Sequence, residues 1–143
     1  MLDQNELLGG MGKLFVKSFM DVAIKTSHEK GDILFHEGDS ALCYYTMISG
    51  KVNLYIRAGH NIYTISTPGE VFGWSSLVER DAYSATAECT EPTLLLRFDK
   101  NVFQKMLEEH PKCSIIFYKN ISKTLGNRLL ASYNFISSAL SPS

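Results

Sequence analysis

The feature that most constrains the fold is a run of short β-type segments between about residues 23 and 99. Tyrosine, valine, isoleucine and threonine are frequent in this run. Glycines separate its segments, at Gly31, Gly38, Gly50, Gly59, Gly69 and Gly73. Short strands with turn signals roughly every 8 to 12 residues are typical of a β-sandwich or barrel. The spacing therefore predicts a β-roll as the middle part of the molecule.

The clearest predicted strand alternates in polarity and places Val52, Leu54 and Ile56 on one face. Residues 58–61 include a glycine and an asparagine and are expected to form a tight hairpin connection to the next strand. Thr93–Phe98 contains a continuous apolar run, Leu94–Leu96, which favours a strand in the centre of a sheet.

Helical patterns flank the β region on both sides. Residues 3–22 show apolar side chains mostly at steps of three and four, broken by glycines, which predicts two short helices or one interrupted helix. Asp99 is a good N-cap for a helix that ends near His110. Pro111 stops that helix and opens a long one, which we expect over residues 112–136.

The long helix carries a coiled-coil-like seam, whose members alternate at steps of three and four. The seam residues are Ile115, Tyr118, Ser122, Leu125, Leu129, Ser132 and Ile136. The pattern favours a homodimer through this helix, although the helix could instead pack only on its own β-roll. Phe117, Ile121 and Phe135 lie off the seam and are expected to pack against the β region.

Length and charge favour one soluble domain. The chain has 143 residues and a formal net charge of −1, which argues against a strongly basic nucleic-acid binder. We expect a single domain over residues 1–143, with helices in 1–22, the β-roll in 23–99 and helices in 99–136. No long apolar run or signal peptide is present, so we expect a cytoplasmic protein without a membrane contact.

Familiar catalytic and metal signatures are missing from the sequence. Cys43, Cys89 and Cys113 are widely spaced and form no CxxC pair, and the four histidines are scattered, so no metal site is expected. The acidic residues show no pairing with a nucleophile. We therefore expect no enzyme activity and no cofactor beyond a possible small-molecule effector.

Four segments, in order, resemble the signatures of cyclic nucleotide-binding domains, in particular the effector domain of catabolite activator protein-like regulators. They are Lys30–Asp39, Ile48–Leu54, Pro68–Gly73 and Ser84–Ala87, and the resemblance covers residues 24–136. It implies an α+β fold with a jelly-roll barrel (a double-stranded β-helix), N-terminal helices and a long C-terminal helix. It also implies a non-catalytic regulatory function.

The phosphate-binding cassette departs from the family at two charged positions. In the family this cassette begins Phe-Gly-Glu and has an arginine nine residues past the glutamate, and these two side chains bind ribose and cyclic phosphate. Here Trp74 stands at the glutamate position and Tyr83 at the arginine position. Because losing one partner of a desolvated charge pair costs about 2–5 kcal/mol, the resemblance implies weak or altered nucleotide binding.

The candidate ligand-binding residues follow from the cassette: Phe72, Gly73, Trp74, Ser75, Ser76, Leu77, Arg80, Tyr83, Ser84 and Thr86. Arg80 either replaces the missing arginine from its loop or is a solvated loop residue. Trp74 either stacks on a planar ligand or fills the pocket as part of the core. Tyr83 either donates its hydroxyl to a ligand or covers Trp74.

Two functions from different classes remain open. The first is a ligand-sensing regulatory module that responds to a cyclic nucleotide or another small molecule and signals through its C-terminal helices. The second is a ligand-independent dimerisation or protein-interaction module, whose pocket is filled by Trp74 and Tyr83. Family members commonly continue into a helix-turn-helix domain, so a chain that is complete at Ser143 is not expected to bind DNA directly.

Overall fold

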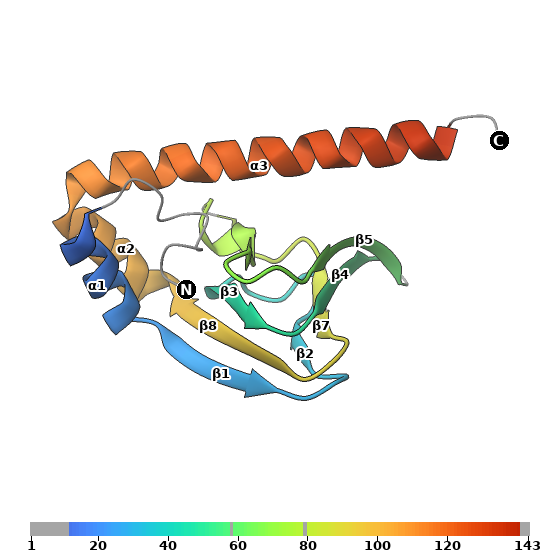
Figure 1. Ribbon diagram of the computed structural model, residues 1–143, viewed down its shortest axis with the longest axis horizontal. Helices are drawn as coiled ribbons and strands as arrows, with labels where there is room; N and C mark the ends of the chain where they lie inside the picture. The colour runs from blue at the N-terminus through green and yellow to red at the C-terminus, as the bar shows by residue number, and fades with distance from the viewer. Residues whose placement is uncertain (1–11, 58, 79, 141–143) are drawn as a thin grey trace.

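The structure is a computed structural model that describes residues 12–57, 59–78 and 80–140. A short helix precedes eight strands, a 3-10 turn interrupts them, and two helices follow (Figure 1). The elements are α1 Lys13–Asp21, β1 Ile24–His28, β2 Ile33–Phe35, β3 Cys43–Ser49, β4 Val52–Ile56, β5 His60–Ile65, β6 Val71–Phe72, η2 Trp74–Ser76, β7 Thr86–Cys89, β8 Thr93–Asp99, α2 Lys100–Glu109 and α3 Pro111–Leu140.

The strands form two four-stranded antiparallel sheets. One sheet has the order β1-β8-β3-β6 and the other β2-β7-β4-β5. Both contribute to a shared apolar core, in which Met47 and Leu95 of the first sheet cluster with Val52 and Ile65 of the second. The α+β jelly-roll prediction is confirmed, with the correction that the two described sheets stay separate and do not close into a barrel.

Local strand predictions hold with one adjustment. Thr93–Asp99 lies between β1 and β3, so its continuous apolar run does belong to a central strand. A hairpin joins β4 to β5 as predicted, but β5 begins at His60, so the connection is shorter than residues 58–61. Arg57 takes a positive φ of 39° where the chain turns. The regular alternation is interrupted, because the register shifts between Leu54 and Tyr55, and only Val52 on that face is fully buried.

A second core joins the helices to the first sheet. Aromatic side chains dominate it: Phe19 of α1 packs on Phe98 of β8 and on Phe103 of α2, with ring centroids 4.4 Å and 5.3 Å apart. Phe117 of α3 belongs to the same cluster, with its ring centroid 4.8 Å from that of Phe103. The described N-terminal helix is α1. The part of the predicted helical region before residue 12 lies outside the described residues.

Asp99 precedes α2 as predicted, but its side chain makes no capping hydrogen bond. Its carboxylate instead accepts a hydrogen bond from Arg97 Nε at 3.2 Å. Pro111 opens α3 as expected, and α3 reaches Leu140, four residues beyond its predicted end.

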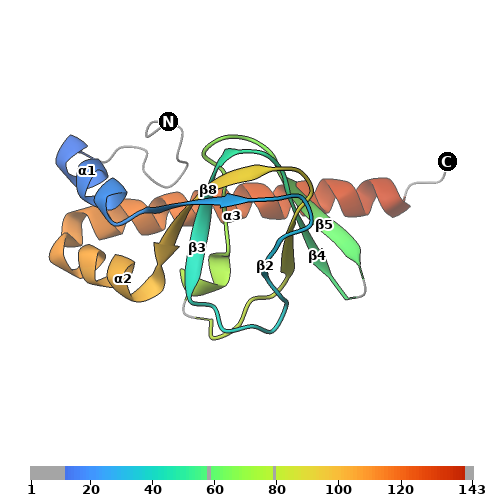
Figure 2. The same ribbon diagram turned by 90° about the horizontal axis from the view of Figure 1, so that it is seen from below.

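Helix α3 runs across the sandwich on the side opposite β1 and β8 (Figures 1 and 2). The side chains of Phe117 and Ile121 on this helix are buried, as predicted. The prediction for Phe135 is wrong, because its side chain is 72% exposed. All seam residues of α3 are exposed in the single chain. No helix among the described residues is long and apolar enough to cross a membrane.

Candidate functional site: a small aromatic pocket beneath helix α3

The pocket is built around a tight turn after β6. Gly73 has a φ of 84°, and a Cβ added there would lie 3.1 Å from Tyr44 Cα and 3.2 Å from the Cys43 carbonyl oxygen. Glycine is therefore required both by conformation and by space. The turn continues into η2, where the Ser76 hydroxyl donates to the Gly73 carbonyl oxygen at 3.0 Å. This short element, Trp74–Ser76, is a single 3-10 turn.

A cavity of about 60 Å³ remains at this turn. Five predicted site residues line it together: Gly73, Trp74, Ser75, Tyr83 and Ser84. Three further residues line the cavity that were not predicted from the sequence. They are Phe35 of β2, Leu54 of β4 and Ala85, which lies in the segment before β7. None of the eight lining residues carries a charge. The cavity therefore offers hydroxyl groups and aromatic faces but no side-chain charge for a phosphate.

The other predicted site residues lie elsewhere. Phe72, Ser76 and Leu77 are buried in the core and do not line the cavity. The Thr86 hydroxyl oxygen accepts a hydrogen bond from the Glu37 backbone N–H at 2.9 Å, which ties β7 to the β2 end of the fold.

Arg80 is solvent-exposed and lines no part of the cavity. Its backbone N–H donates to the Ser75 carbonyl oxygen at 3.0 Å, which closes the loop after η2. The structure therefore places the Arg80 backbone, rather than its side chain, in contact with the cassette.

Tyr83 fills much of the space at the pocket. Its ring stacks on Phe35 with centroids 3.8 Å apart and an interplanar angle of 16°. Its hydroxyl donates to the Cys43 carbonyl oxygen and accepts from the Cys43 backbone N–H at 3.1 Å. Burial, and then the hydrogen bond to the Cys43 side chain, raise the pKa of Tyr83 well above its ordinary value. Tyr83 is thus a neutral side chain that is hydrogen-bonded to Cys43 at the start of β3. Its ring stacks on Phe35 rather than on Trp74.

Trp74 packs towards helix α3. The Arg128 guanidinium lies 5.1 Å from the Trp74 ring and 4.9 Å from the Tyr63 ring of β5. Cation–π contacts of this kind contribute about 0.5–2 kcal/mol each. The indole Nε1 of Trp74 is buried and has no hydrogen-bond partner among the described residues. The cation beside the pocket therefore comes from α3 and not from the loop.

The position of Arg128 could have been found from the sequence. Phe117, Ile121 and Thr124 are buried on α3, and Arg128 continues their spacing of four, three and four residues. Residues at that spacing share one helix face, so the stripe directs Arg128 towards the sandwich.

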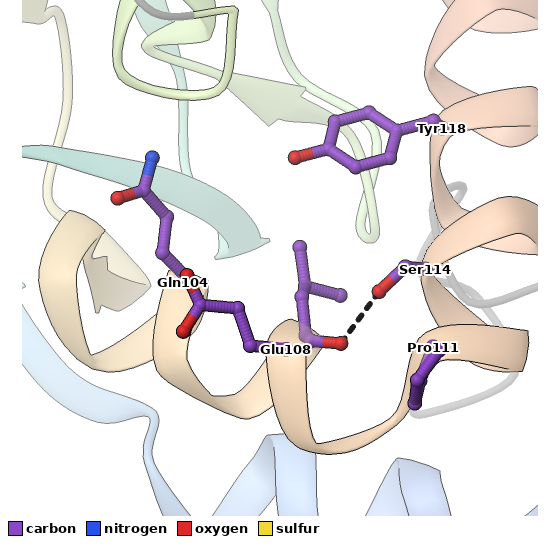
Figure 3. A pocket seen from close by; sticks show the side chains of 6 residues that line it. Gln104, Glu108, Pro111, Ser114 and Tyr118 are labelled. Atoms are coloured by element: carbon purple, nitrogen blue, oxygen red, sulfur yellow. Dashed lines mark hydrogen bonds between the residues drawn. The ribbon is translucent and has the colours of Figure 1, made fainter.

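A separate hollow of about 360 Å³ lies at the elbow between α2 and α3 (Figure 3). Gln104 and Glu108 of α2 face Ser114 and Tyr118 of α3 across it. The Ser114 hydroxyl donates to the Leu107 carbonyl oxygen at 2.6 Å, so this bond fastens the two helices at their junction. Within the described residues, no group of three acidic, histidine or cysteine side chains is placed to hold a metal ion.

Comparison with known proteins gives one family match. The sequence model of the cyclic nucleotide-binding domain matches residues 25–110, which is more than half of the chain. The cyclic AMP receptor protein of Thermus thermophilus is 28% identical over 105 residues, which cover 71% of this chain and 47% of that protein. Lysophospholipase NTE1 of Chaetomium globosum is 28% identical over 104 residues, covering 71% of this chain.

A solved structure shows the same fold. A cyclic nucleotide-binding domain from Methylobacillus flagellatus superposes with a TM-score of 0.84 at 18% identity, covering 99% of this chain and 82% of that one. The chain spans only 7% of the length of the Chaetomium lysophospholipase and less than half of the Thermus receptor. The matched part is therefore a domain that these longer proteins share with this chain.

Proposed function

This chain belongs to the cyclic nucleotide-binding domain family, and on that premise we propose that it is a non-catalytic, cytoplasmic regulatory module with weak or altered nucleotide binding. The observation that carries this proposal is the cavity at the cassette, which measures about 60 Å³ and is lined by uncharged residues. Small-molecule sites usually enclose about 300–1,000 Å³. A cyclic nucleotide would have to displace aromatic side chains before it could enter.

The loss of the two charged side chains also predicts weak nucleotide binding. A buried arginine–phosphate pair that loses one partner costs about 2–5 kcal/mol, and a lost hydrogen-bond acceptor for a ribose hydroxyl adds about 1–3 kcal/mol. Since about 1.4 kcal/mol corresponds to a factor of ten, the combined loss is about a thousandfold or more in affinity. Trp74 and Tyr83 replace both charged groups, and Tyr83 already uses its hydroxyl on Cys43.

The output of this module is proposed to pass through α3. Trp74 belongs to the cassette and contacts Arg128 of α3. A change in the conformation of the cassette would therefore alter a contact with the long helix. A ligand that binds better when this contact is broken would shift the population of helix positions. Occupancy at Gly73–Leu77 and the position of the C-terminal helices would then be thermodynamically linked.

The partner of the exposed seam is proposed to be a second copy of the chain. Ile115, Tyr118, Leu129 and Ile136 are all about half exposed or more in the single chain, and they share the seam. Burying such side chains releases about 25 cal/mol per Å² of apolar surface, which favours association. The filled pocket supports the second candidate function, in which this dimerisation or another protein contact needs no ligand.

Trp74 fluorescence tests the nucleotide part of the proposal, because Trp74 is the sole tryptophan. Titration with cyclic AMP and cyclic GMP should give no saturable change at micromolar concentrations. A saturable micromolar response to either nucleotide would refute weak binding. A response to another metabolite would identify a repurposed sensor, whereas silence to all would favour the ligand-independent module.

A paired variant tests whether the two substitutions account for the weak binding. Trp74→Glu combined with Tyr83→Arg restores the charged groups of the family pattern, and calorimetry should then detect cyclic AMP binding that the natural chain lacks. Tyr133→Phe, at an exposed tyrosine of α3, is the matched control and should leave the titration unchanged. Binding by the natural chain and by the control at the strength of the restored variant would contradict the explanation.

Sedimentation tests the dimer separately. Leu129→Gln removes an exposed seam side chain and should shift the natural chain from dimer towards monomer. Lys123→Gln, which lies off the seam, is the control and should leave the mass unchanged. A monomeric natural chain would contradict the proposed homodimer.

A further inference from the structure

The hollow at the elbow between α2 and α3 has a negative charge in its lining. Its volume of about 360 Å³ lies in the range of about 300–1,000 Å³ that is common for small-molecule sites. The residues that line it are Gln104, Leu107, Glu108, Pro111, Ser114 and Tyr118. Glu108 carries the one charge among these six residues. We call this space the elbow hollow.

The Glu108 carboxylate is accessible to a ligand. Its side chain is exposed and makes no ion pair or hydrogen bond with another residue that the structure describes. Lys112 follows Glu108 by four residues, which is the spacing of a helical ion pair. The two residues lie on different helices, however, because α2 ends at Glu109 and α3 begins at Pro111. A bound cation would therefore displace only water from this carboxylate.

The Ser114 hydroxyl adds a hydrogen-bond acceptor to the elbow hollow but no donor. A serine hydroxyl has one hydrogen and two lone pairs. The hydrogen is donated to the Leu107 carbonyl oxygen at 2.6 Å (Figure 3). The His110 carbonyl oxygen, at 3.3 Å, competes for the same hydrogen. A ligand in the hollow therefore meets only the lone pairs of the Ser114 oxygen.

The Gln104 side chain supplies a third polar group. Gln104 precedes Glu108 by four residues on α2, so the two side chains share one face of that helix. Its amide makes no hydrogen bond with another described residue, and rotation of the amide directs its oxygen into the hollow. The elbow hollow thus offers three groups with acceptor oxygens, one of which is charged.

We propose that the elbow hollow binds a primary ammonium group that is attached to a small apolar body. A primary ammonium has three N–H donors and no acceptor. The Glu108 carboxylate, the Gln104 amide oxygen and the Ser114 hydroxyl oxygen match these donors in number, and the carboxylate also matches the charge. Hydrogen bonds between an ammonium and a carboxylate are stronger than those between neutral groups.

The remaining lining accommodates the apolar body of such an amine. Leu107, Pro111 and Tyr118 contribute apolar surface to the hollow, and Leu107 is itself buried. An aromatic or aliphatic group packed on this surface loses contact with water, which favours binding. A carboxylic acid of the same shape would be repelled by Glu108, and a neutral alcohol would leave the carboxylate without a counter-charge.

A bound amine contacts both helices of the elbow. Gln104 and Glu108 belong to α2, whereas Ser114 and Tyr118 belong to α3. The ligand therefore favours the angle between α2 and α3 at which all of these contacts are made. The effect of this angle on the output of the chain rests on the proposed regulatory function, but binding of the amine does not.

Calorimetric titration with 2-phenylethylamine, 2-phenylethanol and 3-phenylpropanoate tests the elbow hollow in the full chain. These probes share a phenyl ring and differ in charge. The amine should bind saturably and about fivefold or more tighter than the alcohol, because an exposed charge pair contributes up to about fivefold and hydrogen bonds to the ammonium add to it. The acid should bind most weakly. Equal affinity for amine and alcohol, or no saturable binding of the amine, would overturn the proposal.

A fourth probe separates hydrogen bonding from charge. The N,N,N-trimethyl derivative of 2-phenylethylamine keeps the positive charge but has no N–H donor. It should bind more weakly than the primary amine, because the three acceptor oxygens then have no donor to pair with. Equal affinity for the two cations would show that these oxygens do not select a primary ammonium, and the proposal would be wrong.

A pair of variants assigns the binding to the hollow. Glu108→Gln keeps the shape of the side chain but removes its charge, and should lower the affinity for the amine to that for the alcohol. Glu109→Gln makes the same change at an exposed neighbour that does not line the hollow, and should bind the amine like the natural chain. Unchanged amine binding by Glu108→Gln, or an equal loss in both variants, would refute the assignment.

Hydrogen exchange tests whether the amine joins the two helices. Backbone amides in residues 108–115 should exchange more slowly at saturating 2-phenylethylamine, whereas 2-phenylethanol at the same concentration should have a smaller effect. Unchanged exchange at saturation would contradict the contact with both helices. No nucleotide enters these experiments, so their outcome does not depend on the proposed weak nucleotide binding.

Protein concentration separates the amine from a second copy of the chain as the occupant, since Tyr118 lines the elbow hollow and also belongs to the proposed dimer seam. The affinity for 2-phenylethylamine should be the same at protein concentrations above and below dissociation of the dimer. Loss of amine binding in the dimer would mean that a second copy covers the hollow, and the proposal would be wrong.

Discussion

Replacing Tyr83 by phenylalanine isolates the role of its hydroxyl, because the ring and its stacking on Phe35 remain. The hydroxyl exchanges two hydrogen bonds with the Cys43 backbone, beyond the point where β6 stops pairing with β3. Its removal leaves the Cys43 N–H and carbonyl without this partner. An unsatisfied buried polar group costs about 1–3 kcal/mol, so Tyr83→Phe should lower the free energy of unfolding by that amount.

Urea denaturation followed by circular dichroism at 25 °C measures this difference. In a domain of this size each kcal/mol corresponds to about 2–4 °C in Tm, so a thermal scan should show a fall of several degrees. Tyr133→Phe on the exposed side of α3 is the control and should stay within about 0.5 kcal/mol of the natural chain. If Tyr83→Phe is as stable as this control, the hydroxyl is not anchored to Cys43, and Tyr83 remains available to a ligand.

Four further predictions follow from local geometry. Gly50→Ala should prevent stable folding or cost several kcal/mol, because its Cβ would meet Thr93 atoms at 2.4–2.6 Å and its φ is 110°; soluble expression and urea denaturation check this. Gly126→Ala should instead stabilise the chain by about 0.5–1 kcal/mol, since nothing lies within 4 Å of that Cβ in helix α3, and an unchanged midpoint would contradict this. Burial raises the pKa of Tyr83 in the folded chain, so the unfolded chain loses this proton at a lower pH than the folded chain does. The Tyr83 contribution to stability should therefore be constant below about pH 10 and fall as the pH rises above it, which alkaline unfolding curves will show. Burial likewise raises the pKa of the Cys89 thiol, so iodoacetamide should modify the half-buried Cys113 well before Cys89, as mass spectrometry of peptides can determine.

The β-roll was predictable because its signals are local. Glycine at positions of positive φ, such as Gly38 and Gly50, marks turns that neighbouring residues cannot override. By contrast, β1 contains one apolar residue, Ile24, followed by mostly polar ones, and no alternation distinguishes it. Its strand conformation comes from pairing with β8, which is some 70 residues later in the sequence. Pairing across that separation cannot be deduced from strand propensity alone.

The pocket was predictable in part. The cassette residues Gly73, Trp74 and Tyr83 lie together as their spacing suggested. Phe35 and Leu54 complete the cavity from two distant strands, and no local pattern assigns a strand residue to one cavity rather than to the general core. The choices left open for Trp74 and Tyr83 depend on side-chain packing, which only the three-dimensional arrangement shows.

Residue spacing along helix α3 predicted the burial of some side chains correctly and that of another wrongly. The buried stripe of Phe117 and Ile121 and the exposed seam follow from spacing at three and four residues. The same reasoning failed for Phe135, because periodicity identifies a face of a helix but not how far the neighbouring sheet extends beneath it. Residues 131–140 are all exposed, although Phe135 still borders a hollow of about 260 Å³ that Ile62 and Tyr63 of β5 also line.

Calorimetric titration of the natural chain with cyclic AMP tests the central claim most directly. The cavity of about 60 Å³, closed by Tyr83 and Trp74 and lined by uncharged residues, predicts no saturable heat at micromolar nucleotide. Saturable binding with a micromolar or lower Kd would contradict the account. It would mean that the aromatic side chains move aside and that another residue supplies the charge for the phosphate.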